Sequence, residues 1–326
     1  MRGAKLNRAE LIALALVVAC VLLAPLVGSR LAIYNLTLIA LYATVVISLN
    51  LLLGLAGQAS FAQTTFMAIG GYGNAILTTR YGLNPWLAMA LSLILSLGLA
   101  FLIGRPLLRL RGHYLSMGTV ALALGTASFA NASTFTNGGW GITGVPSLTI
   151  GDFSFRDPLA FYVLAWSLCA ACLLAFHLLD NSYIGRAWRA LSTRQEIASS
   201  LGIDVPRYKQ LALVLAAAMA SLAGSFYVEF THFVGPDLYD ISVVLNLMFM
   251  LFVGGLRSTV GPIIGAGFVI LTPQFVAGFE RYQNIVFFML LLLVILLCPA
   301  GILGRMPDAR GITSLLPDFL RRPIRS

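Results

Sequence analysis

Cys169 and Cys172 have the Cys-x-x-Cys spacing that occurs in redox-active and metal-binding sites. Such sites usually draw on further imidazole, thiol or carboxylate groups, whereas the residues around this pair are apolar. The other two cysteines, Cys20 and Cys298, also lie within apolar runs. We therefore interpret all four as small buried hydrophobic residues, and we predict no metal site.

The sequence contains no motif for a nucleotide-binding site. A phosphate-binding loop of the type G-x-x-x-x-G-K-[ST] needs a lysine after a glycine, but Lys5 follows Ala4 and Lys209 follows Tyr208. No Ser/His/Asp or paired-carboxylate spacing is present, so we predict no catalytic residue. Any ATP and Mg²⁺ would be bound by a separate chain.

Ion-coupled transport usually requires an ionisable side chain deep in the membrane. Of the 12 acidic residues, only Glu229 falls near the interior of an apolar run, and it lies close to the end of that run. Sodium coupling through backbone carbonyls would leave no such mark, so a self-sufficient carrier or channel remains an alternative. We nevertheless expect the energy source to lie outside this chain.

The elements that carry these residues are membrane spans. Hydrophobic residues make up 59% of the chain, charged residues 10%, and the mean hydropathy is +0.90. Because a spanning helix needs roughly 20 apolar residues, the recurring runs predict an all-α integral membrane protein with about ten spans. We place them at 11–28, 32–54, 61–79, 86–104, 113–131, 159–179, 210–230, 241–256, 259–278 and 283–298.

The distribution of positive charge predicts the orientation. With the N-terminus inside, only Arg30, Arg80, Arg156 and Arg281 fall outside, which leaves 17 of the 21 Lys and Arg residues on the cytoplasmic side. Both termini are therefore predicted to be cytoplasmic, and the first apolar run is predicted to be an uncleaved helix. Topology also explains the net charge of +9 better than nucleic-acid binding does.

A polar island interrupts the spans at residues 181–209. Its sequence predicts two short amphipathic helices, the first with Trp188 and Leu191 on one face. Thr193 and Glu196 have the spacing of a capping box at the start of the second helix, and Gly202 suits a left-handed C-terminal cap. Such a charged loop in a membrane protein indicates a docking surface for a soluble partner, although helices of this kind can also lie at the lipid interface.

An early glycine-rich segment carries polar residues at membrane depth. Glycines there allow helices to approach closely or break, and the accompanying polar side chains could line a pathway for a zwitterion with an apolar side chain. Hydrogen bonding between helices is an equally good explanation. The pathway candidates, which include one residue of a later span, are Gln58, Ser60, Gln63, Thr64, Asn74 and Asn246.

Three ordered blocks resemble one family. These blocks are 57–72, the stretch 185–224 with Leu201-Gly202-Ile203 and Ala220-Ser221-Leu222-Ala223-Gly224, and 254–266 with Gly254-Gly255-Leu256-Arg257-Ser258. Over roughly residues 35–300 they resemble the permease subunits of branched-chain amino acid ABC importers, of the LivM type. The resemblance implies an ABC importer permease fold for residues 1–326 as a single domain, with a coupling loop at 181–209 and a cytoplasmic tail at 300–326.

The resemblance also implies partners in a bacterial cytoplasmic membrane. Two ATPases would dock on the coupling loop, a second permease chain would complete the pathway, and a periplasmic or lipid-anchored binding protein would deliver leucine, isoleucine or valine. Related permeases carry urea, short amides or other amino acids, which remain alternatives. The coupling residues expected on this basis are Arg186, Trp188, Leu191, Thr193, Glu196, Leu201 and Gly202.

The predicted outer loop between residues 131 and 157 also resembles the family at 136–144. Asn137 and Trp140 are candidates for contact with the binding protein. An interfacial anchor is the alternative role for Trp140.

Overall fold

The computed structural model describes residues 29–107, 113–150, 153–193, 195–200 and 202–275, together with 15, 17, 18, 21, 289, 292, 301 and 302. The predicted spans 11–28 and 283–298 lie almost wholly outside the described residues. Leu201 and nearly all of the tail 300–326 also lie outside them.

Five helices in the described part of the chain are long and apolar enough to cross a membrane. They are α2 (Arg30–Leu49), which continues into the π-helix η1 (Asn50–Leu55), α4 (Pro85–Leu107), α5 (His113–Ala132), α6 (Pro158–Asn181) and α9 (Val205–Thr231). They coincide with five of the predicted spans. A helix satisfies all of its backbone hydrogen bonds internally, which suits these apolar segments to the water-free bilayer core.

Three further predicted spans are helical but short. They are α3 (Gln63–Thr79), α10 (Ile241–Gly254) and α11 (Gly261–Phe275), with 17, 14 and 15 residues. At 1.5 Å per residue, the longest of them extends only about 25 Å, less than the ~30 Å of a hydrocarbon core. The total of ten spans therefore stays a prediction, because α3 and α10 are shorter than a spanning helix and the residues that follow Phe275 of α11 lie outside the described part.

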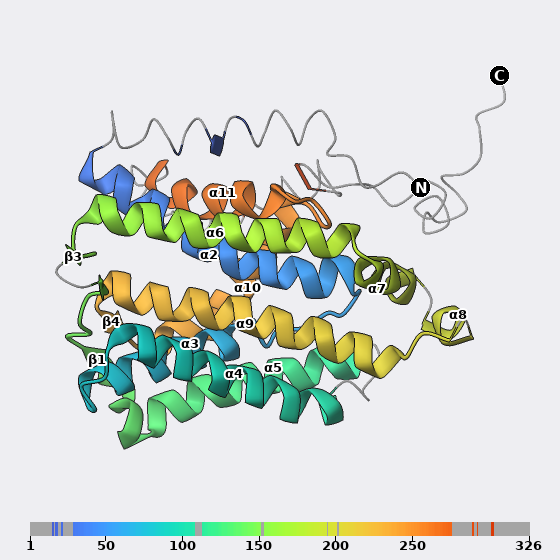
Figure 1. Cartoon of the computed structure of the whole chain (residues 1–326), viewed down its shortest axis with the longest axis horizontal. Helices are drawn as coiled ribbons and strands as arrows, with labels where there is room; N and C mark the ends of the chain where they lie inside the picture. Colours follow the sequence, from blue (N-terminus) through green and yellow to red (C-terminus); the bar gives the residue numbers. More distant parts are fainter. Residues whose placement is uncertain are drawn as a thin grey trace.

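The helical body is built around α9, which packs against α2, α3 and α4, while α2 also packs against α6 and α11 (Figure 1). The crossing of α3 and α9 is very close. A Cβ atom on Gly70 would overlap the backbone of Ser221, and one on Gly224 would overlap the backbone of Met67. These glycines let the two backbones meet directly, which is typical of helix pairs in membranes.

The two ends of the body differ in structure (Figure 1). The short helices α7 (Tyr183–Thr193) and α8 (Gln195–Ser200) lie at one end. The other end carries β1 (Ile142–Thr143) paired antiparallel with β4 (Phe233–Val234), and β2 (Thr149–Ile150) paired with β3 (Phe153–Ser154). The 3-10 turns of the connecting segments are η2 (Thr134–Thr136), η3 (Gly138–Trp140) and η4 (Pro236–Tyr239). The helical body thus separates the two sets of polar connections.

Candidate coupling site and translocation pocket

The first short helix, α7, begins at a serine that separates it from α6. The Ser182 hydroxyl donates to the carbonyl of Leu179 at 2.7 Å and accepts from the amide of Gly185 at 3.2 Å. This hydroxyl satisfies both a final carbonyl of α6 and an early amide of α7. The chain can therefore turn sharply at the end of the helical body.

The apolar face of α7 is turned inward. Trp188 is fully buried and its Nε1 donates to the carbonyl of Tyr208, on α9, at 2.8 Å. Leu191 is only 2% exposed. The sequence correctly placed these two residues on one face, but that face packs against this chain itself, so neither side chain lies on the surface available to a partner.

The exposed face of the α7–α8 segment is polar. Lys209, on α9, fixes one end of α8, because its Nζ donates to Oε1 of Gln195 at 3.0 Å. Thr193 is the last residue of α7, and its hydroxyl donates to the carbonyl of Arg189 at 3.0 Å. Its predicted capping box with Glu196 stays a prediction, because the intervening residue 194 lies outside the described part. The exposed residues are Tyr183, Arg186, Thr193, Gln195, Glu196, Ser199 and Ser200.

The end of α8 follows the prediction for Gly202. Its φ is +81°, its amide donates to the carbonyl of Ser199 at 3.0 Å, and the amide of Ile203 donates to the carbonyl of Ala198 at 3.2 Å. A left-handed residue of this kind satisfies the last carbonyls of a helix at little cost when it is glycine. The predicted left-handed cap is confirmed, and Leu201 beside it lies outside the described residues.

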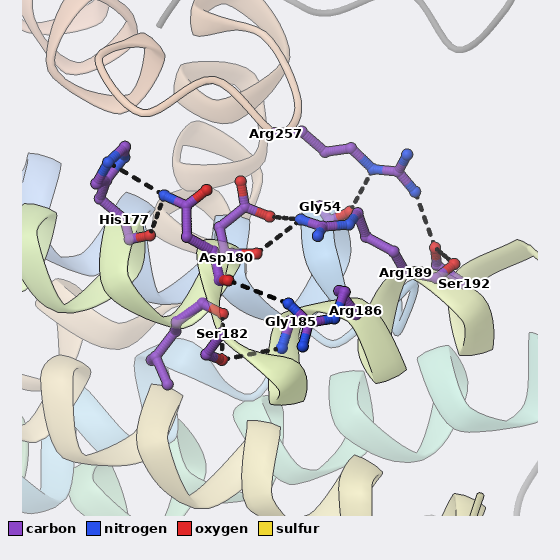
Figure 2. A network of polar contacts seen from close by, with 11 residues as sticks. Gly54, His177, Asp180, Ser182, Gly185, Arg186, Arg189, Ser192 and Arg257 are labelled. Atoms are coloured by element: carbon purple, nitrogen blue, oxygen red, sulfur yellow. Dashed lines mark hydrogen bonds and ion pairs between the residues drawn. The ribbon is translucent and has the colours of Figure 1, made fainter. Parts of the chain in front are cut away.

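Arg257 links α7 to the interior of the body (Figure 2). It lies in the turn between α10 and α11, and its Nε donates to the carbonyl of Gly54, on η1, at 2.8 Å. Its Nη2 donates to the hydroxyl of Ser192, on α7, also at 2.8 Å. Asn50 holds the same turn from the other side, because its Oδ1 accepts from the amide of Arg257 at 2.9 Å and its Nδ2 donates to the carbonyl of Ser258 at 2.8 Å.

A second arginine fastens α7 to the end of α6. Arg189 forms an ion pair with Asp180, and its Nη1 also donates to the Asp180 carbonyl at 2.8 Å (Figure 2). Burial lowers the pKa of Arg257, the nearby charge of Arg189 lowers it further, and Asp180 partly offsets this effect. The negative charge of Asp180 therefore stabilises the positive charges of Arg189 and Arg257, where α6, α7 and the α10–α11 turn meet.

Three of the six pathway candidates lie together. Ser60, Gln63 and Thr64 line a narrow pocket, whose apolar side comes from α2, α10 and residue 61. Gln63 and Thr64 are buried, and Oγ1 of Thr64 has no hydrogen-bond partner among the described residues. A buried polar group without a hydrogen-bond partner lowers the free energy of unfolding by roughly 1–3 kcal/mol.

The other three pathway candidates lie elsewhere. Nε2 of Gln58 donates to the carbonyl of Lys209 at 3.4 Å, near the α7–α8 segment. Nδ2 of Asn74 donates to Oε1 of Glu229 at 2.9 Å between α3 and α9, which is the helix–helix bonding that was the alternative explanation. Asn246 is half-buried on α10 and is not among the residues that line the pocket.

The two outer-loop candidates lie at the end of the body opposite α7 and α8. Asn137 has a left-handed backbone with φ of +68°, and its Nδ2 donates to the carbonyl of Gly141 at 2.9 Å. Trp140, in η3, is 88% exposed. An aromatic ring this exposed is available either to a protein partner or to the lipid interface, so the contact with a binding protein stays a prediction.

The sequence matches the family model for the permease component of branched-chain amino acid transport systems over residues 31–295. The chain belongs to this family of transport permeases. It is 27% identical to the high-affinity branched-chain amino acid transport system permease protein LivM of Salmonella typhimurium over 303 residues, which cover 86% of this chain and 71% of that protein. It is also 27% identical to the permease protein LivH of Escherichia coli K12 over 288 residues, which cover 82% of this chain and 93% of LivH. No solved structure matches the chain.

Several residues that organise this permease were not singled out from its sequence. Arg257 and Ser192 stood inside blocks already noted, but neither carries a pattern that names its partner. The positive φ of Arg257, +63°, is unusual for a residue with a side chain, and only its bonds to two other elements explain it. Gly57, whose φ is +65°, lies against Ser192, and a Cβ atom there would crowd this contact.

Proposed function

We propose that this permease is the membrane-spanning subunit of an ATP-driven importer for leucine, isoleucine and valine. The observation that carries the proposal is the family match across residues 31–295. It is supported by the similarity to LivM and LivH, whose names describe high-affinity branched-chain amino acid transport. The long apolar helices suit a pathway subunit, and ATP hydrolysis would belong to separate ATPase subunits that bind ATP and Mg²⁺.

The α7–α8 segment is the part that we expect to dock on an ATPase. Its exposed residues include Arg186, Thr193 and Glu196, whereas its buried residues hold it to α9. Movement of α7 would reach the membrane helices through Ser192 and Arg257, which contact η1 and the α10–α11 turn. Packed elements linked in this way move as units, so closure of an ATPase pair would shift the helices around the pocket.

The remaining features of the proposal concern topology and partners. We place α7 and α8, with both termini of the chain, on the cytoplasmic side of the bacterial inner membrane, and we retain ten spans. Trp140 and Asn137 then face the periplasm, where a soluble or lipid-anchored binding protein would deliver the substrate. A second, different permease chain would complete the pathway.

Transport by the reconstituted complex tests this function. The permease, purified with its associated subunits, is placed in proteoliposomes, and uptake of radiolabelled leucine and urea is compared with and without ATP and the binding protein. We expect leucine uptake that needs both. ATP-dependent urea uptake would replace the substrate, and uptake driven by an ion gradient without ATP would establish a secondary carrier.

A further inference from the structure

The short helix α3 begins beside the pocket with a free positive end. Its N-cap residue is Ala62, which has no side-chain group to accept a hydrogen bond from the first turn. The N-terminus of a helix carries a partial positive charge and amides that point outward, which favour an anionic group. In membrane transporters, helices that start within the bilayer use this end to hold the carboxylate of a substrate.

Two hydroxyl groups at this end of α3 can donate into the pocket. The Ser48 hydroxyl donates to the carbonyl of Val45 at 2.6 Å, and its oxygen lies 3.2 Å from the side-chain amide of Gln63, which it holds beside the pocket. Thr64 is fully buried, and its hydroxyl is unpartnered among the described residues. The hydroxyl oxygen of Ser60 accepts from the amide of Ala62 at 3.3 Å, so its hydrogen remains able to donate into the pocket.

The rest of the pocket is apolar and uncharged. Its other lining residues are Leu49, Phe61, Val244, Leu247 and Met248. Buried polar groups normally find partners, and two hydroxyl groups beside the uncapped N-terminus of α3, at one side of an apolar pocket, indicate a ligand with one anionic end and one hydrophobic end. The ammonium group of an amino acid lies next to its carboxylate, at the polar end of the pocket, where the hydroxyl oxygens of Ser60 and Thr64 can accept from it, whereas a charged side chain would reach the apolar wall and be buried without a partner.

We infer that this pocket binds the carboxylate of a neutral aliphatic amino acid. The carboxylate lies at the N-terminus of α3 and accepts from Thr64 and Ser60, while the side chain packs against α10. This inference rests on the proposed function for the transported substrate, and it adds the subsite at which the permease holds it. Discrimination against amino acids with charged side chains then belongs to the permease as well as to any binding protein.

The pocket is narrow in this conformation, and the gap between its side chains has no room for a water molecule. α10 packs mainly against α11 and α2 and touches α3 only lightly. Separation of α3 and α10 would therefore open the pocket while breaking few contacts, and the unsatisfied hydroxyl of Thr64 favours the state in which a ligand binds it.

Two neighbouring threonines provide a matched test. Thr64→Val removes the unpartnered hydroxyl, whereas Thr65→Val removes a hydroxyl that lies 3.1 Å from Oγ1 of Thr126 and does not line the pocket. The complete complex is reconstituted in proteoliposomes with binding protein, and leucine uptake per ATP hydrolysed is measured together with the melting temperature. Thr64→Ser, which keeps the hydroxyl, serves as the conservative variant.

For Thr64→Val we expect a fall of roughly tenfold in uptake per ATP, since a hydrogen bond to a charged group is lost. Its melting temperature should not fall, because the hydroxyl has no partner to lose. Thr65→Val should stay within about twofold of the parent in uptake, and Thr64→Ser, which keeps the hydroxyl, should retain more uptake than Thr64→Val. Unchanged uptake by Thr64→Val, or a loss matched by a lower melting temperature, would overturn the subsite.

The substrate that the unsubstituted complex transports distinguishes failure of the subsite from failure of the proposed function. If it transports a different neutral amino acid, and this uptake shows the same dependence on Thr64, the subsite stands and the substrate assignment changes. If it transports urea, which has no carboxylate, both are overturned. If it transports leucine without dependence on Thr64, only the subsite is overturned.

Discussion

Trp188 shows how a single side chain decides what α7 can do. The indole fills a site against α9 and donates to the carbonyl of Tyr208, so α7 is fixed to the body by packing and by a hydrogen bond. The surface offered to a partner is then set by Arg186 and by the polar residues that follow on α8. The docking surface that we propose on α7 and α8 depends on Trp188 for its position and on the exposed residues for its chemistry.

Substitution of Trp188 should therefore act through stability. Trp188→Phe removes the indole N–H that donates to the carbonyl of Tyr208, and we expect the free energy of unfolding to fall by about 1 kcal/mol. Trp188→Ala also removes buried side-chain volume and should lower the free energy of unfolding by about 3–5 kcal/mol. Arg186→Ala, an exposed change on the same helix, should leave the melting temperature of the purified complex unchanged and weaken co-purification of the ATPase.

These measurements distinguish positioning from direct contact. A Trp188→Phe variant that melts like the parent and yet loses its ATPase would show that the indole itself meets the partner. Normal ATPase retention by Arg186→Ala together with Glu196→Ala would contradict docking on the exposed face of the α7–α8 segment.

The sequence allowed some residue positions to be predicted and not others. Helical periodicity placed Trp188 and Leu191 on one face, and glycine chemistry placed the left-handed turn at Gly202. An apolar face has the same pattern whether it packs on its own chain or on a partner, so the burial of Trp188 could not be foreseen. The role of Arg257 could not be predicted, because its partner Gly54 lies 203 positions away in the sequence.

At the scale of elements, Arg257 connects three segments that the sequence keeps far apart. It joins α7, η1 and the α10–α11 turn through one guanidinium group. The guanidinium fork can reach both acceptors at once, with one nitrogen for each. Because α10 also forms the apolar wall of the pocket, this connection provides a physical route between the docking segment and the proposed substrate site.

Arg257→Lys should break this connection while keeping the charge. An ammonium group at the end of a flexible chain cannot reproduce both bonds, and loss of one at about 1 kcal/mol corresponds to roughly a fivefold weaker link. We expect ATP hydrolysis by the reconstituted complex to continue while leucine uptake per ATP falls about fivefold. Arg207→Lys is the matched control, because Arg207 is exposed and pairs only with Asp204 among the described residues.

Two results of the Arg257→Lys experiment would contradict this prediction. Equal uptake per ATP in the Arg257→Lys and Arg207→Lys variants would show that α7 reaches the membrane helices by another route. A parallel fall in ATP hydrolysis and uptake would indicate loss of the complex rather than loss of coupling.

Hydropathy located every described helix of the body, since lipid requires apolar residues wherever a helix crosses. The predicted runs 61–79 and 241–256 differ from α3 and α10 by two residues each, and the residues after Phe275 of α11 lie outside the described part. Hydropathy does not show which elements lie beside one another. The start of α3 beside the pocket was therefore visible only in three dimensions.

The whole molecule has two polar ends with different properties. One end consists of helices α7 and α8 with an arginine-rich junction, and the other consists of short strand pairs, 3-10 turns and the exposed Trp140 (Figure 1). The long helices between them fix these ends on opposite sides of any membrane that they cross. The positive charge of the sequence predicts that the α7–α8 end is the cytoplasmic one.

Thiol labelling in intact cells tests this orientation. Single cysteines at positions 140 and 186, made as Trp140→Cys and Arg186→Cys, replace exposed side chains at the two ends in a background whose four native cysteines are changed to alanine. An impermeant maleimide should label position 140 in intact cells and position 186 only after the membrane is permeabilised. Because the two sites lie at opposite ends of one rigid set of helices, their labelling must change together if the orientation is inverted. Labelling of position 186 alone in intact cells would place α7 outside and remove it from contact with any cytoplasmic ATPase, whereas labelling of both would contradict the separation of the two ends by a membrane.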